Sequence, residues 1–267
     1  MGFESATTSP DVLERHFVEL RSAGRRALVV YITAGHPDLD RSLELLRGLD
    51  DAGADVVEVG VPFSDPMADG VVIQASSQRA LVHGMTLDKT LDLIARARVR
   101  APVVLFSYLN PLLASRESLL ERAADAGVHG ILVTDLPVGA DPEIEAWLGS
   151  GPLSFVRLVA PTTPRARMAE IGRHGRGFVY LISRLGVTGE RSTLPDELPT
   201  TVAALRQATS LPICVGFGIS RPEHVAAVGR LADGVVVGSA VVRAADNDID
   251  AALSLVRAMR SSLDELS

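Results

Sequence analysis

Eight short apolar runs recur along this chain, and a stretch with the periodicity of an amphipathic helix follows each of them. The runs span residues 27–33, 55–60, 101–108, 130–135, 153–160, 177–183, 212–217 and 233–238. They are continuous rather than alternating polar and apolar, which is typical of a parallel sheet covered on both faces. Eight such units predict a closed (β/α)8 barrel, the TIM-barrel architecture, and a doubly wound open sheet is the alternative.

Segments with helical periodicity fill the intervals and flank the runs at both ends. They span residues 10–23, 39–53, 74–83, 86–99, 116–126, 141–149, 165–173, 199–209, 221–230 and 249–264. The first precedes every strand, so the barrel is expected to carry an extra N-terminal helix. Three helix-to-strand junctions, DAGADVVEVG, DAGVHGILVTD and RLADGVVVGS, share one build and indicate quasi-repeated units. No linker divides the chain, so a single barrel domain over residues 1–267 is predicted.

The net charge and the reactive side chains argue against several classes of function and site. The net charge of −7 argues against nucleic acid as a partner. The six histidines lack metal-ligand spacing and the one lysine, Lys89, falls on a helix expected to face solvent, so neither a metal site nor Schiff-base chemistry is expected. The one cysteine, Cys214, excludes an intramolecular disulfide, and no apolar run approaches the ~20 residues of a membrane span. With no signal peptide recognised, a soluble cytoplasmic protein is expected.

The second predicted strand contains a carboxylate among β-branched residues. Glu58 would share one strand face with Val56, where a buried charge is costly unless it is paired or its pKa rises. A structural ion pair would explain one such acid, but Asp69 on the following loop adds a second. Two carboxylates in different environments suit acid–base catalysis. Tyr180 on the sixth strand could present its hydroxyl to the same pocket, with a core aromatic as the alternative.

Three glycine-rich segments follow the last three strands. They are GVTG (186–189), GFGIS (216–220) and VVGSA (236–240), and the last leads into a short helix. Glycines let backbone N–H groups approach an anion, and a helix N-terminus adds a favourable dipole. Each segment alone could be a plain turn, but together they predict a phosphate site, with Ser239 adding a hydroxyl. The residues alone thus predict a phosphate-bearing small molecule and two carboxylates, which also fits isomerases of phosphorylated sugars and aminoimidazole intermediates.

The chain resembles the α subunits of tryptophan synthase over nearly its whole length. The motifs that carry the resemblance are VEVGVPFSDPMADGVVIQ (57–74), YLISRLGVTG (180–189) and VGFGIS (215–220), supported by YITAGHP (31–37) and SYLNP (107–111). The resemblance implies a (β/α)8 barrel and a carbon–carbon lyase in tryptophan biosynthesis. Its reaction would be the retro-aldol cleavage of indole-3-glycerol phosphate to indole and glyceraldehyde 3-phosphate.

The resemblance also assigns roles to residues. Glu58 matches the catalytic glutamate that moves a proton between the indole C3 and the glycerol hydroxyl, and Tyr180 matches the tyrosine beside it. Asp69 matches the aspartate that accepts the indole N–H and stabilises the indolenine cation. Thr188, on the loop after the sixth strand, matches a residue that reaches towards Asp69 when the loops close. The matched phosphate-binding positions are Gly189, Gly218, Gly238 and Ser239. The matched indole-pocket positions, for which a plain core role is the alternative, are Phe106, Leu132 and Phe217.

Family members pair with a pyridoxal-phosphate β subunit, which takes the indole through an internal channel to make L-tryptophan. The resemblance therefore implies an α2β2 heterotetramer, with no pyridoxal phosphate on this chain. The matched partner-facing residues are Asp65, Pro66, Asn110 and Pro111. One departure from the family is Val71, where proline is common, and this change is expected to loosen the loop and to affect the coupling to a β subunit.

Two further hypotheses stay open at this point. The chain could act alone and release free indole, as specialised relatives do, because both acids are present in either case. It could also be a non-catalytic regulatory subunit that only activates a partner. An isomerase of another phosphorylated metabolite is remote, given the length of the 57–74 match.

Overall fold

Eight parallel strands close into a barrel in the computed structural model, which describes residues 12–182, 195–216 and 218–266. The strands are β1 Ala27–Thr33, β2 Val56–Gly60, β3 Val103–Ser107, β4 Val128–Val133, β5 Ser154–Val159, β6 Val179–Ile182, β7 Ile213–Gly216 and β8 Gly234–Val237. They pair in sequence order, and β8 pairs with β1. The predicted (β/α)8 barrel is therefore confirmed, and the open sheet is excluded.

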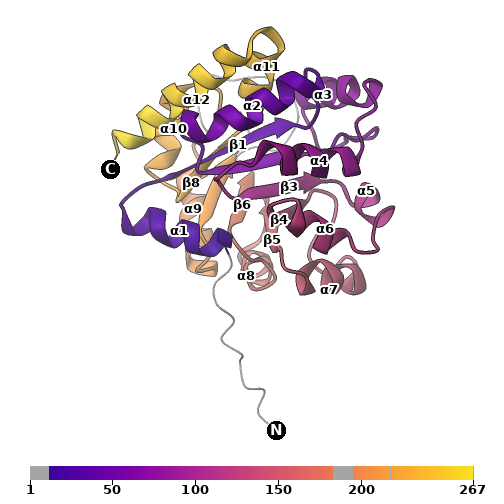
Figure 1. Ribbon diagram of the computed structural model, residues 1–267. Helices are drawn as coiled ribbons and strands as arrows, with labels where there is room; N and C mark the ends of the chain where they lie inside the picture. Colours follow the sequence, from indigo (N-terminus) through magenta and orange to yellow (C-terminus); the bar gives the residue numbers. More distant parts are fainter. Residues whose placement is uncertain (1–11, 183–194, 217, 267) are drawn as a thin grey trace.

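Helices surround the barrel, and α1 lies at the end where the strands begin (Figure 1). Their bounds are α1 Val12–Ser22, α2 Leu39–Ala52, α3 Val71–Val82, α4 Leu87–Ala97, α5 Leu109–Leu113, α6 Leu119–Asp125, α7 Pro142–Ser150, α8 Arg165–Arg173, α9 Leu198–Ala208, α10 Pro222–Gly229, α11 Ser239–Asn247 and α12 Ile249–Asp264. The two ends of α2 show how the sequence starts and stops a helix. Asp38 caps the start of α2 by accepting from the N–H of Arg41, and Gly53 ends it in the left-handed conformation, at φ 93°.

Side chains alternate along each strand between the barrel interior and the layer beneath the helices. Val56 belongs to the apolar cluster inside the barrel, whereas Val57 and Val59 belong to the outer cluster under the helices. Glu58, between those two valines, therefore points into the barrel, as the period of two predicts.

Helix α1 closes the N-terminal end of the barrel with its apolar face. Leu13, Phe17 and Leu20 join the interior cluster, and the rings of Phe17 and Phe178 lie 5.4 Å apart. Gly177 makes room for Leu13 of α1, since a Cβ there would lie 2.5 Å from that side chain. The extra N-terminal helix is thus the floor of the barrel.

The three helix-to-strand junctions with a common sequence pattern also share one kind of hydrogen bond to the preceding strand. Asp55, just before β2, accepts from the N–H of Leu28 on β1 at 2.8 Å. Asp233, just before β8, accepts from the N–H of Ile213 on β7 at 2.9 Å. In β4 the ring of His129 accepts from the first N–H of β3 at 3.2 Å. Each polar residue ties its strand to the preceding strand and satisfies a backbone donor that the ladder leaves unpaired.

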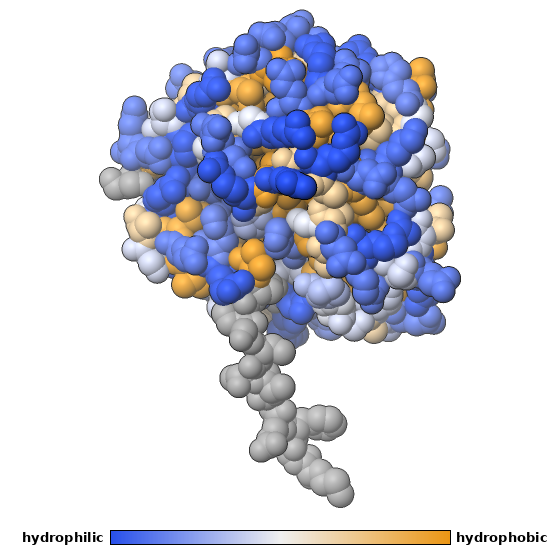
Figure 2. Space-filling view, viewed as in Figure 1, coloured by the Kyte–Doolittle hydropathy of each residue, from blue (hydrophilic) through white to orange (hydrophobic). Residues whose placement is uncertain are grey.

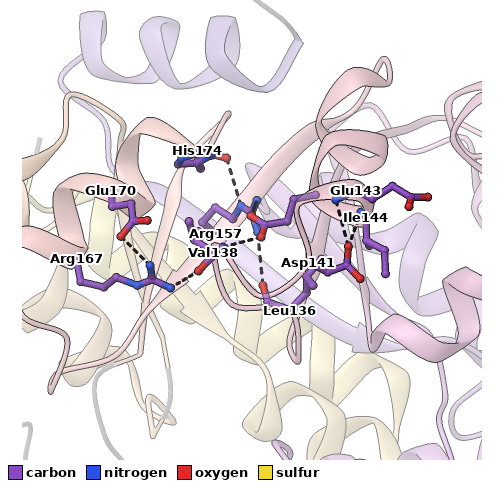
Figure 3. A network of polar contacts seen from close by, with 11 residues as sticks. Leu136, Val138, Asp141, Glu143, Ile144, Arg157, Arg167, Glu170 and His174 are labelled. Carbon is purple, nitrogen blue, oxygen red and sulfur yellow. Dashed lines mark hydrogen bonds and ion pairs between the residues drawn. The ribbon is translucent and has the colours of Figure 1, made fainter.

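Two arginines fix the loop between β4 and α7 at the opposite, C-terminal rim (Figure 3). Arg157, on β5, donates to Glu145 of α7 at 2.7 Å and to the carbonyl oxygen of Leu136 at 3.5 Å. Arg167, on α8, donates to the carbonyl oxygen of Val138. This part of the rim is therefore held from three neighbouring elements.

The structure departs from the predicted elements in two places on that rim. Helix α3 begins at Val71, three residues earlier than expected, so Val71 opens a helix and does not lie within the loop. Asn110 and Pro111 were expected only to end a strand, but they lie in the short helix α5. Proline fits there because the first turn of a helix makes no use of its missing N–H.

The outer surface is polar with apolar side chains interspersed, as Figure 2 shows for one face. Within the described residues, no helix combines the length and the apolar character that crossing a membrane requires.

Candidate active site

Glu58 is enclosed by the interior of the barrel. It stands on β2 opposite Tyr31 of β1 and Val104 of β3, and only 1% of its surface is exposed. Neither carboxyl oxygen has a hydrogen-bond partner among the described residues. Burial without a partner disfavours the charged form and raises the pKa of Glu58 to about 8. Most of the Glu58 population therefore carries a proton at neutral pH, where the group can donate it.

Two buried tyrosines face the same interior. Burial raises the pKa of Tyr31 and that of Tyr180, and the charges of Glu58 and Asp69 raise both further. All four groups thus lie within electrostatic reach of one another. The prediction that Tyr180 would lie near the acids agrees with this arrangement. Tyr31 was not predicted, although its place two residues from the end of the first strand was a usable signal.

Two glycines leave space for the hydroxyls of these tyrosines. A Cβ on Gly60 would lie 2.1 Å from the hydroxyl oxygen of Tyr31, and one on Gly216 would lie 2.2 Å from that of Tyr180. In both cases the tyrosine pairs with a residue on the next strand, and the glycine lies two positions after that residue. The strand sequence therefore sets how deep each hydroxyl reaches into the barrel.

Asp69 lies at the rim, on the loop between β2 and α3, and is 8% exposed. Its N–H donates to the carbonyl oxygen of Pro66 at 3.1 Å, and Gln74 of α3 donates to its carbonyl oxygen at 2.8 Å. Burial raises the pKa of the Asp69 carboxyl to about 6, and a hydrogen bond from Tyr108 opposes this rise. At neutral pH Asp69 is therefore mostly ionised while Glu58 is mostly protonated. This difference is what an acid and an electrostatic stabiliser require.

Tyr108, which the sequence did not single out, holds the loop that carries Asp69. Its hydroxyl accepts from the N–H of Ala68 at 2.9 Å, and its ring stacks on Phe63 with centroids 5.0 Å apart. Tyr108 directly follows β3, so its position at a strand end was the available signal.

The described part of the expected phosphate site lies at the ends of two paired strands. Gly218 follows β7 with φ 76°, and Gly238 and Ser239 follow β8 at the start of α11. The first N–H groups of a helix have no partner within it, so the start of α11 offers donors and a favourable dipole to an anion. Gly189, Thr188 and Phe217 lie outside the described residues.

An apolar wall stands beside the two acids. Phe106 of β3 packs edge-on against Tyr31, with ring centroids 5.2 Å apart, and Leu132 of β4 belongs to the same interior cluster. Among the described residues, no three His, Cys, Asp or Glu side chains are grouped as a metal site would need. The site thus combines flat apolar contact with the Glu58 carboxyl inside the barrel and the Asp69 carboxylate at its rim.

The residues expected to face a partner come together on the C-terminal rim. Asp65 and Asn110 are exposed, and Pro66 and Pro111 are half-buried. Tyr108 brings their two segments together, because it hydrogen-bonds the loop after β2 and directly precedes α5. Met67, in the first segment, is 88% exposed.

Comparison with known proteins gives consistent matches. The sequence profile of the family described as tryptophan synthase alpha chain matches residues 17–266. The tryptophan synthase alpha chain of Desulfatibacillum aliphaticivorans is 44% identical over 241 residues, which are 89% of this chain and 91% of that protein. The Geobacter sulfurreducens protein of the same name is 48% identical over 230 residues, or 85% and 87% of the two chains.

Solved structures agree with these relatives. A chain of Mycobacterium tuberculosis tryptophan synthase superposes with a TM-score of 0.89 at 31% identity, covering 96% of this chain and 99% of that one. Tryptophan synthase subunit alpha of Legionella pneumophila superposes with a TM-score of 0.87 at 32% identity, covering 96% and 100% of the two chains.

Proposed function

This chain belongs to the tryptophan synthase alpha chain family, and from that premise we propose how its residues cleave indole-3-glycerol phosphate into indole and glyceraldehyde 3-phosphate. The observation that carries the proposal is the buried carboxyl of Glu58 inside the barrel, with the ionised carboxylate of Asp69 at the rim above it. The reaction needs a proton donor that later accepts a proton, and a fixed negative charge.

Glu58 is the proton carrier of the cleavage. Its carboxyl gives a proton to C3 of the indole ring, which leaves an indolenine cation and a Glu58 carboxylate. The bond between C3 and the glycerol chain then breaks, and its electron pair restores the aromatic ring. The carboxylate takes the proton of the glycerol hydroxyl on the departing carbon as the aldehyde forms. Glu58 ends protonated, and a pKa of about 8 lets it work in both directions near neutral pH.

Asp69 stabilises the cation. Its carboxylate accepts the indole N–H, whose positive charge grows when C3 is protonated, and a fixed anion placed there lowers the barrier. Tyr108 orients this carboxylate through the hydrogen bond to it. Tyr180 and Tyr31 pack beside Glu58 and keep water from its carboxyl.

The phosphate end of the substrate binds at the start of α11. Gly218, Gly238 and Ser239 supply backbone and hydroxyl donors there, and the dipole of α11 favours the negative charge. Phe106 and Leu132 contact the indole ring from the barrel interior.

Variants of the two acids test these roles through indole release and substrate binding. Glu58→Gln keeps the size of the side chain but cannot carry the proton, so cleavage is expected to fall by at least about 10³-fold while substrate still binds. Asp69→Asn is expected to lose about 10²–10³-fold in kcat. Tyr180→Phe serves as the matched control in the same cavity, with a smaller loss. Full activity in Glu58→Gln would refute the mechanism.

We further propose that a tryptophan synthase β subunit docks on the rim formed by Asp65, Pro66, Asn110 and Pro111, in an α2β2 assembly. The exposed side chains of Met67 and Val71 on the same rim support this docking, because burying them would be favourable. Indole release by the chain alone should be slow and should rise on adding a β subunit. Fast release that is indifferent to the β subunit would instead identify a lyase that acts alone, and no release under either condition would contradict the proposed function.

A further inference from the structure

Helices α3 and α11 lie side by side on the barrel (Figure 1). Helix α3 begins two residues after Asp69, and α11 begins at Ser239. On the proposed function, each helix therefore starts at one end of the bound substrate: α3 at the indole N–H and α11 at the phosphate. The distance between the two helix starts must match the length of the molecule they hold.

A cluster of three charged or polar side chains joins the opposite ends of these helices. Arg79, in the last turn of α3, contacts Asp246, in the last turn of α11, with Nη1 and Oδ1 2.6 Å apart. His36, on the loop after β1, places Nε2 3.3 Å from the same carboxylate oxygen. One oxygen of Asp246 thus meets a side chain from α3 and a side chain from the β1 rim.

The cluster is poorly placed to serve stability alone. The side chains of Arg79 and Asp246 are 49% and 37% exposed, and ion pairs in such positions contribute little to the free energy of unfolding. His36 is 3% exposed, so its buried ring is a rigid neighbour for the carboxylate of Asp246. Such a pair can bias the angle of one helix against another by no more than that small free energy.

Both helices also rest on β1 nearer the site. Ser76 of α3 hydrogen-bonds Thr33 of β1 at 2.7 Å, and Gly238 at the start of α11 lies against Tyr31 of β1, where a Cβ would come within 3.3 Å of that side chain. Ser76 lies one turn from Arg79 on α3, and His36 lies three residues after Thr33, so these contacts and the Arg79–Asp246–His36 cluster form one junction that ties both helices to the end of β1. Loosening this junction frees the start of α3 to shift relative to the start of α11.

We propose that Arg79, Asp246 and His36 are positioning residues that set the separation between the indole end and the phosphate end of the site, and so its fit to the substrate length. This inference rests on the proposed function. A shift of about 1 Å in such a site can cost on the order of 10²-fold in rate, although neither end loses a contact of its own.

Ligands that fill only one end of the site distinguish a change in the separation of the two ends from damage to either end. Indole and glycerol 3-phosphate each fill one end, whereas an indole that carries its phosphate on a three-carbon chain fills both. In Asp246→Asn and Arg79→Met, the affinities for the two half-ligands, measured by calorimetry, should stay within about twofold of wild type. The affinity for the three-carbon compound should fall by about threefold to fivefold, together with kcat/KM for the substrate, because an exposed ion pair holds the helix starts with only a small free energy. The preference for a three-carbon over a four-carbon chain should also shrink.

Asp51→Asn removes the exposed ion pair with Arg100, at 2.8 Å on the helical layer, and should leave every affinity unchanged. The reversed pair, Arg79→Asp with Asp246→Arg, should restore the length preference. Equal weakening of half-ligands and whole ligand, or unchanged length preference in both variants, would overturn the inference. Failure of the wild-type chain to bind the three-carbon compound would instead overturn the proposed function.

Discussion

Replacing Glu58 with glutamine is expected to raise the free energy of unfolding at neutral pH, because the folded chain holds this carboxyl where its charged form is disfavoured. The pKa of Glu58 is raised from 4.5 to about 8 by burial. Between these two pH values the folded state retains a proton that the unfolded state releases, so wild-type stability falls as the pH rises. Glutamine carries no charge in either state and escapes this loss.

The magnitude follows from the pKa difference. One pKa unit corresponds to about 1.4 kcal/mol, so at pH 7 the wild type loses about 3 kcal/mol relative to Glu58→Gln. Above pH 8 the difference should level off at roughly 5 kcal/mol, and at pH 4.5 it should be close to zero. These differences are large compared with the free energy of unfolding of a typical folded protein, which is about 5–15 kcal/mol. The proposed proton carrier is thus expected to destabilise the fold that holds it.

Urea unfolding of wild type and variant from pH 5 to pH 9, followed by circular dichroism, measures the difference. Asp69→Asn is the matched control, because burial raises the Asp69 pKa only from 3.8 to about 6. The gain from Asp69→Asn should therefore be complete near pH 6, at about 3 kcal/mol or less, while the gain from Glu58→Gln continues to grow up to pH 8. A Glu58→Gln difference that is constant between pH 6 and pH 8 would refute the raised pKa.

Three more substitutions test other parts of the structure. Gly60→Ala should cut kcat by displacing the Tyr31 hydroxyl that lies 2.1 Å from the new Cβ, and adding Tyr31→Phe should recover part of the loss; unchanged indole release in Gly60→Ala would contradict this. Asp55→Ala should cost about 1–3 kcal/mol in urea unfolding, because Arg260 keeps only the half-exposed Asp264 as an acidic partner and the buried N–H of Leu28 loses its acceptor, whereas adding Arg260→Met should return part of the loss; an unchanged urea midpoint would argue against the pair. Leu13→Ala should cost about 2–5 kcal/mol by opening the barrel floor, with indole release at low temperature as the check that the site survives; an unchanged urea midpoint would show that α1 does not close the barrel.

Much of the architecture could be predicted from the sequence because burial on both faces leaves continuous apolar runs, which a parallel barrel needs at every strand. Glu58 was found for the same reason, since a carboxylate inside such a run is conspicuous. The short helix α5 was missed because Asn110 and Pro111 favour a turn locally, and only the chain around them shows that the proline falls in a first helical turn.

Contacts between residues far apart in the sequence could not be predicted either. Tyr108 acts on Ala68, forty positions away along the chain, and nothing in the spacing of the two residues shows that their strand ends meet. Arg79 and Asp246 are 167 positions apart, and each alone resembles an ordinary charge on a helix surface. Sequence patterns report how each element buries itself, whereas contacts between element ends depend on how the barrel closes.

The floor of the barrel also has a consequence for how the chain is made. Phe17 of α1 packs on Phe178, so this contact of α1 cannot form until about 160 further residues have been synthesised. At roughly 5–20 residues per second, the apolar face of α1 waits on the order of ten to thirty seconds. During that interval Leu13, Phe17 and Leu20 form an exposed apolar stripe on the nascent chain, of the kind that chaperones bind.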